Sequence, residues 1–102
     1  MIDQLEDRRT EVAELCRRFG VSSLFVFGSA VSGDFDPDHS DIDFLVEFDH
    51  FSGVSRFDAF FGLKDGLEAL LRRPVDLVSV SALTNPYLAE TIVRTRQELY
   101  AA

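Results

Sequence analysis

The chain has 102 residues, 46% of them hydrophobic, which suits one folded domain, residues 1–102, rather than a disordered segment. Its formal net charge is −8, from 10 lysines and arginines against 18 aspartates and glutamates, and so acidic a surface would repel a long nucleic-acid backbone. A single cysteine excludes a disulfide within the chain, and the lack of a long apolar run or a basic leader predicts a cytoplasmic location with no membrane span.

The first half of the chain predicts a helix and then a strand. Apolar residues recur at roughly helical spacing over residues 2–18, with Asp3 as a plausible N-cap and Gly20 closing the helix. The hydrophobic run over residues 21–27 predicts the first strand. Residues 29–40 hold a glycine, a proline and three aspartates, and this composition predicts a loop that opens with a helical turn.

The rest of the chain predicts two more strands and two more helices. Residues 41–48 form the second strand, which is apolar on both faces at residues 44–46, as expected of a central strand. A polar connection over 49–55 leads to a second helix. The expected elements that follow the connection are a helix at 56–72, a strand at 75–80, a turn at 81–85 and a helix from 86 to about 99. This order predicts an α/β or α+β domain, in which helices flank a small mixed β-sheet.

Two aspartates open the second predicted strand. Because side chains alternate faces along a strand, Asp41 and Asp43 point the same way while Ile42 points into the core. Carboxylate oxygens are the ligands that Mg²⁺ and Mn²⁺ prefer, and a cation held by a few carboxylates keeps positions open for phosphate. The competing interpretation is a solvated turn, in which aspartate pairs of this kind are common.

Asp76 is the only acidic residue in the third predicted strand, between Val75 and Leu77. A charge in an apolar strand is costly unless it is paired or exposed at a site. If this strand lies beside the second one, Asp76 can join the aspartate pair as a third metal ligand. If it does not, Asp76 is an edge residue that faces water.

Gly28 and Ser29 end the first strand, and Gly33 lies in the loop that follows. A glycine lets another group approach the backbone closely, and a serine at the start of a helical turn offers its hydroxyl and its N–H to a phosphate. Gly33 permits a positive φ angle. Taken alone, a glycine–serine pair is also an ordinary turn.

Together these segments resemble the signature of the DNA polymerase beta-type nucleotidyltransferase superfamily, and more narrowly its minimal nucleotidyltransferase branch. Members of that branch are often paired with HEPN proteins in bacterial and archaeal toxin–antitoxin systems. The similarity covers nearly the whole chain and rests on residues 27–29, 40–46, 70–78, 85–88 and 98–100.

The resemblance implies a nucleotidyltransferase fold and the roles of its site residues. It implies that Gly28 and Ser29 bind the triphosphate, with Gly33 in the same loop. Asp41, Asp43 and Asp76 would ligate Mg²⁺ or Mn²⁺, and Asp76 would also activate the incoming hydroxyl. The implied reaction transfers AMP from ATP, or another nucleoside monophosphate, to a hydroxyl on a HEPN-type partner protein and releases pyrophosphate. Apolar helix surface, where exposed, would support a homo- or hetero-oligomer.

A binding module that neutralises its partner by occlusion is the alternative. The loop between Ser29 and Asp41 has one residue more than the family usually has, and Ser32 stands where many members carry an arginine that would bind phosphate. A small-molecule nucleotidyltransferase is disfavoured, since the chain lacks room for a separate substrate domain.

Overall fold

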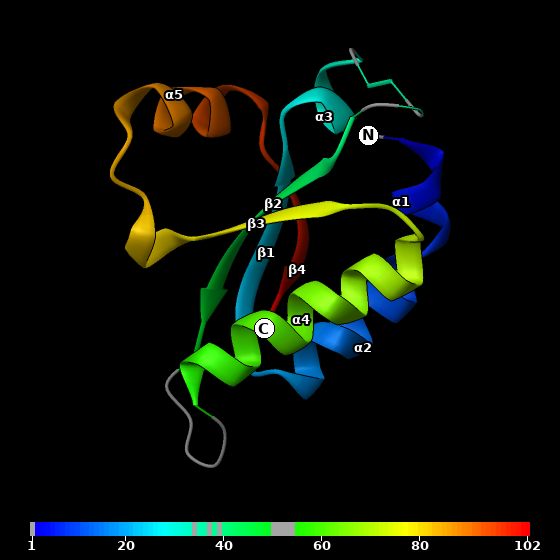
Figure 1. Ribbon diagram of the computed structural model, residues 1–102, viewed down its shortest axis with the longest axis vertical. Coiled ribbons are helices and arrows are strands. Elements are labelled where there is room, and N and C mark those ends of the chain that lie inside the picture. Colours follow the sequence, from blue (N-terminus) through cyan, green and yellow to red (C-terminus); the bar gives the residue numbers. More distant parts are fainter. Residues whose placement is uncertain (1, 34, 37, 39, 50–54) are drawn as a thin grey trace.

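The computed structural model describes residues 2–33, 35–36, 38, 40–49 and 55–102 (Figure 1). Its strands form one sheet in the order β3-β2-β1-β4. β1 runs antiparallel to β2 and β4, whereas β3 runs parallel to β2, so the sheet is mixed and the α+β prediction is confirmed. The strands are β1 (Val21–Phe27), β2 (Ile42–Phe48), β3 (Val75–Ser79) and β4 (Gln97–Ala101).

The described helices lie between these strands and before the first of them. No helix among the described residues is both long and apolar enough to cross a membrane. A short 3₁₀ turn, Val80–Ala82, follows β3. The α-helices are α1 (Asp3–Asp7), α2 (Arg9–Arg18), α3 (Ser29–Ser32), α4 (Arg56–Leu71) and α5 (Pro86–Thr95).

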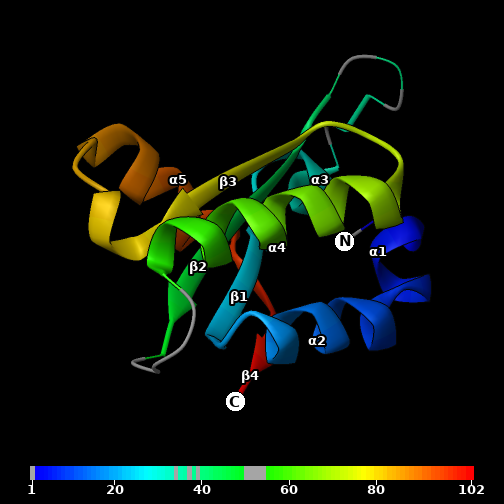
Figure 2. The same cartoon turned by 60° about the horizontal axis from the view of Figure 1, so that its bottom comes forward.

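Helices cover the two faces of the sheet unequally. Figure 2 shows α2 and α4 side by side on one face, where they bury the main core. That core includes Leu24 of β1, Phe44 of β2 and Leu67 of α4, which are all fully buried. On the opposite face a smaller cluster joins Phe27 and Leu45 to Ile92 of α5. The sheet is therefore packed on both sides near α5.

The central position predicted for the second strand is confirmed. β2 pairs with β1 on one side and with β3 on the other. Phe44, Leu45 and Val46 are all buried, because consecutive side chains face the two different clusters. The condition set for Asp76, that its strand lies beside the second one, is also met.

The helix predicted over residues 2–18 is broken into two. Arg8 has φ −112° and ψ 15°, which lie outside the helical range and separate α1 from α2. Asp3 is not the N-cap, because Ile2 takes that position and no side chain caps the helix. At the other end Gly20 has φ +69°, the left-handed conformation typical of a glycine that closes a helix.

The predicted last helix is wrong over its final turn. α5 ends at Thr95, and Arg96 adopts the extended angles φ −60° and ψ 140°. The residues after Arg96 form β4, which the sequence analysis missed. Pairing with β1 explains this outcome, since a helix to residue 99 would leave the backbone of β1 unpaired on that side.

Arg72 offers a test of the turn that leads from α4 into β3. Among the described residues it is the non-glycine residue with a positive φ, +55°. A side chain in this conformation costs about 1–2 kcal/mol. We expect Arg72→Gly to raise the free energy of unfolding by about 0.5–1 kcal/mol in urea denaturation, after the extra entropy of glycine in the unfolded chain is subtracted.

Arg72→Ala is the matched control, because it removes the same side chain and keeps the strained backbone. It is expected to give no stabilisation. Equal stabilities of the alanine and glycine variants would contradict the role assigned to backbone strain.

Candidate active site

Two of the predicted carboxylates lie side by side on the sheet. The parallel register of β2 and β3 pairs Asp43 with Asp76. Asp43 shares its face with Leu45, whose side chain packs against α5, so both carboxylates lie on the α5 face of the sheet. Asp41 directly precedes β2 and is exposed, as is Asp76, whereas Asp43 is half-buried.

The charges of Asp41 and Asp76 both act on the carboxyl of Asp43. The pKa of the Asp43 carboxyl is raised from 3.8 to about 6, first by its loss of contact with water and then by the negative charges of Asp76 and Asp41. A divalent cation would offset this repulsion, and the donors are the hard oxygens that such a cation prefers. The donor set therefore fits the metal that the resemblance implies.

The side chains do not form a complete metal cage as they stand. Within the described part of the chain, no group of three or more histidine, cysteine, aspartate or glutamate side chains is placed to hold a metal ion. Three like charges repel one another, and Asp41 is exposed just before the first residue of β2. The three-carboxylate metal site therefore stays a prediction.

The glycine–serine turn lies against these carboxylates. Phe27 pairs with Asp43 across the β1–β2 ladder, so Gly28 comes next to Asp43. Gly28 has φ +75° and ψ −143°, and a Cβ atom built on it would lie 2.7 Å from Oδ2 of Asp43. Only glycine allows both this backbone conformation and this close approach.

Ser29 and Gly33 mark the two ends of α3. Ser29 is the first residue of this helical turn, and no described side chain caps it. The first N–H groups of a helical turn have no partner inside it, so they are available to a ligand. Gly33 ends the turn with φ +92°, and nothing lies within 4 Å of a Cβ atom built on it. Its left-handed conformation ends α3, and the structure does not bring it against Asp43.

The start of β3 is fixed by hydrogen bonds that the sequence analysis missed. The N–H of Val75 donates to Oε2 of Glu68 on α4 at 3.1 Å, and this bond holds the pKa of Glu68 below its ordinary value. The N–H of Ile42 donates to the carbonyl of Pro74 at 3.3 Å. These two bonds hold the residue before Asp76 and the residue before Asp43. Glu68 lies seven residues before Val75, whereas Pro74 is far from Ile42 in the sequence, so no local pattern could have found the second bond.

Thr95 is a second residue that the sequence analysis missed. Its hydroxyl accepts a hydrogen bond from the N–H of Gly28 at 2.9 Å. The predicted helix ran past residue 95, so no local pattern placed this side chain beside the glycine–serine turn.

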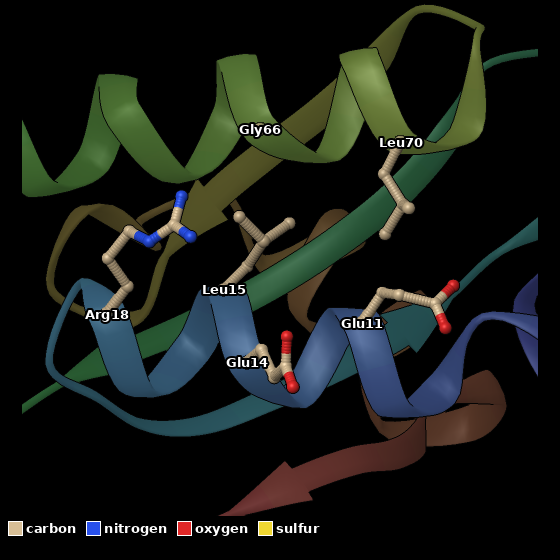
Figure 3. A pocket seen from close by; sticks show the side chains of 6 residues that line it. All are labelled: Glu11, Glu14, Leu15, Arg18, Gly66 and Leu70. Atoms are coloured by element: carbon tan, nitrogen blue, oxygen red, sulfur yellow. The ribbon is translucent and has the colours of Figure 1, made fainter.

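A separate groove lies between α2 and α4. Figure 3 shows Leu15 and Arg18 rising from α2 toward α4. Glu11 and Glu14 of α2 and Gly66 and Leu70 of α4 also line the groove. Because α2 and α4 cover the other face of the sheet, this groove is separated from Asp43 and Asp76 by the sheet itself. It contains none of the predicted site residues.

Comparison with known proteins gives one consistent result. The nucleotidyltransferase domain model matches residues 9–99. The protein adenylyltransferase MntA of Thermococcus cleftensis is 43% identical over 81 residues, which are 79% of this chain and 77% of that protein. A solved structure described as a candidate minimal nucleotidyltransferase is 37% identical, with a TM-score of 0.75, and the match covers 94% of this chain and 95% of that one.

A more distant structure shares the fold alone. It is described as a tri-AMPylated Shewanella oneidensis HEPN toxin in complex with an MNT antitoxin, and the matching chain is 20% identical with a TM-score of 0.64. That match covers 95% of this chain and 72% of the other. From the family model and the 43% identical relative, the chain belongs to the nucleotidyltransferase domain family, as the resemblance of its glycine–serine and aspartate motifs implied.

Proposed function

We propose that this protein is a protein adenylyltransferase that transfers AMP from ATP to a hydroxyl of a partner protein. The observation that carries the proposal is the row formed by Gly28, Asp43 and Asp76, in which a glycine turn suited to phosphate lies against paired carboxylates suited to a divalent cation. We further propose that the partner is a HEPN-type toxin and that this chain is its antitoxin.

The relatives support the choice of nucleotide and of acceptor. The MntA relative is named for adenylyl transfer to protein. The distant structural neighbour is described with an AMP-modified HEPN toxin as the partner of an MNT antitoxin. A transferase name does not favour the occlusion alternative, in which binding alone would neutralise the partner.

Asp41, Asp43 and Asp76 would hold the cation, which we propose to be Mg²⁺ or Mn²⁺. When bound, such a cation neutralises charge on the phosphate oxygens. Gly28 and Ser29 would orient the triphosphate for in-line attack. Asp76 is exposed on the edge strand β3, where a hydroxyl from a partner can reach it, and it would accept the proton of that hydroxyl. The new bond joins this oxygen to the α-phosphorus, and pyrophosphate leaves.

Labelled ATP tests the proposal directly. The protein is incubated with Mg²⁺, a HEPN-type partner and ATP that carries the label on either the α- or the γ-phosphate. We expect the α-label on the partner and the γ-label in pyrophosphate. Without α-label transfer by the folded protein, the proposed activity would be wrong.

A double substitution separates catalysis from occlusion. Asp41→Ala with Asp43→Ala removes two predicted ligands while the surfaces away from the site stay unchanged. We expect the variant to bind the partner and fail to neutralise it. Full neutralisation by the variant would instead support occlusion.

A further inference from the structure

The hydroxyl of Thr95 joins two elements that are far apart in the sequence. Thr95 is the last residue of α5 and is half-buried. Its Oγ1 accepts from the N–H of Gly28 at 2.9 Å and donates to the carbonyl of Thr91 at 2.7 Å. The hydroxyl therefore donates one hydrogen bond and accepts another, which fixes its direction.

The Gly28 N–H has no other partner among the described residues. The β1–β2 pairing ends at Phe27 and the β1–β4 pairing at Val26, so Gly28 lies beyond both ladders. An unpaired, partly buried N–H group would be costly, and the Thr95 hydroxyl satisfies it. Among the described residues, this bond joins α5 to the glycine–serine turn.

The hydrogen bond from Gly28 to Thr95 affects the backbone conformation of Gly28. Its φ of +75° and ψ of −143° lie in a region open essentially to glycine alone, and a glycine can leave that region for others at little steric cost, so the bonds around it decide its conformation. The carbonyl of Gly28 accepts the N–H groups of Val31 and Ser32, both at 3.0 Å, and so closes the first turn of α3. Thr95 holds the peptide on the N-terminal side of Gly28, and α3 holds the peptide on its C-terminal side.

We propose that Thr95 is a positioning residue for nucleotide binding. Its hydroxyl locks the Gly28 peptide so that the free N–H groups at the start of α3 keep a fixed direction toward the phosphates. The inference rests on the proposed function for its ligand, a nucleoside triphosphate. It adds that α5, which belongs to the C-terminal part of the chain, sets the geometry of the phosphate-binding turn.

Thr91 supplies a matched control on the same helix. Its hydroxyl donates to the carbonyl of Tyr87 at 3.1 Å, the same bond one turn earlier, whereas the N–H of Gly28 donates to Thr95. Thr91→Val and Thr95→Val therefore remove the same kind of bond within α5. Only the second removes a bond to the turn.

The test measures the affinity for a non-hydrolysable ATP analogue with Mg²⁺ by calorimetry. We expect Thr95→Val to weaken binding about tenfold, the usual effect of losing one hydrogen bond, whereas Thr95→Ser and Thr91→Val stay within about twofold of the wild type. Thr95→Ala removes the hydroxyl with less added bulk and replaces Thr95→Val if valine prevents folding. Unchanged binding by the hydroxyl-free variant, or equal weakening by Thr91→Val, overturns the proposal.

A second readout needs no ligand. Hydrogen exchange of the Gly28 amide, followed by NMR, is expected to be at least about tenfold faster in Thr95→Val than in Thr91→Val, since only the first leaves this N–H unpaired. If the wild type fails to bind the nucleotide, the proposed function is wrong. The exchange rate of the Gly28 amide then tests, by itself, whether Thr95 holds the glycine–serine turn. Equal exchange rates in the two variants refute it.

Discussion

Asparagine in place of Asp43 is expected to abolish AMP transfer and, at the same time, to stabilise the metal-free protein. Both effects have one cause. The Asp43 carboxylate is half-buried and faces the negative charges of Asp76 and Asp41, so its ionisation opposes folding. Asparagine keeps the shape of the side chain and removes the charge. The clustered negative charge thus lowers the stability of the metal-free protein, and the same charge can attract a cation.

The size of the stabilisation follows from the pKa. A rise from 3.8 to about 6 corresponds to roughly 3 kcal/mol before any correction. Because Asp43 is only half-buried, water screens part of this energy. We expect Asp43→Asn to raise the free energy of unfolding by about 1–2 kcal/mol near pH 7.5, as measured by urea denaturation without metal.

The stabilisation should also depend on pH. The folded pKa of Asp43 lies above the ordinary value, so the folded protein binds this proton more tightly than the unfolded chain does. The stability that the proton confers is complete below about pH 4 and is lost as the pH rises through about 6. The advantage of Asp43→Asn over the wild type is therefore greatest above about pH 7 and shrinks as the pH falls toward 5.

The same variant should lose transfer activity by at least about 100-fold, or about 2.7 kcal/mol of transition-state stabilisation. Glu47→Gln is the control, since it removes one negative charge from the same strand, at an exposed position farther from Gly28. It should change stability by less than about 0.5 kcal/mol and leave transfer intact. A destabilised Asp43→Asn, or one that retains activity, would argue against the proposed site.

Much of the site was predictable because it depends on short sequence patterns within single strands. The alternation of Asp41, Ile42 and Asp43 follows from strand geometry alone, and an acidic residue in an apolar strand pointed to Asp76. The register that pairs Asp43 with Asp76 was not predictable. It depends on how β2 and β3 meet, which the bond from the Ile42 N–H to the Pro74 carbonyl helps to fix.

Two missed features, the strand β4 and the role of Thr95, depend on partners distant in the sequence. The predicted last helix ran to about residue 99 and so covered the start of β4, and only the free edge of β1 explains why residues 97–101 pair as a strand. Thr95 likewise acquires its role from Gly28, 67 residues away. Local patterns specify elements and faces well. They do not specify which hydroxyl or carbonyl reaches a given N–H across the fold.

Alanine in place of Gly28 is expected to reduce AMP transfer far more than it reduces stability. The added Cβ atom would lie 2.7 Å from Oδ2 of Asp43, closer than real Cβ contacts allow. Since the contacted atom is the end of a side chain, Asp43 can rotate away at small cost. The remaining cost is that of a non-glycine residue at φ +75° and ψ −143°, about 1–3 kcal/mol.

The rotation that relieves the clash is what damages activity. Asp43 would turn away from Asp76 and leave the proposed metal ligands separated, and the turn that faces the triphosphate would shift with the new side chain. Catalytic groups misplaced by about 1 Å can cost about 100-fold in rate. We therefore expect label transfer to fall by at least about 100-fold while urea denaturation still shows a folded protein.

Gly33→Ala separates this effect from backbone strain. Gly33 also has a positive φ, +92°, but a Cβ atom there meets nothing within 4 Å. Its substitution should cost about 1–2 kcal/mol of stability, comparable with Gly28→Ala, and leave transfer within a few-fold of the wild type. If the two variants lost activity in proportion to stability, the close approach of Gly28 to Asp43 would have no role in the reaction. A large loss confined to Gly28→Ala would mean that the glycine is needed for the room it leaves to a catalytic carboxylate.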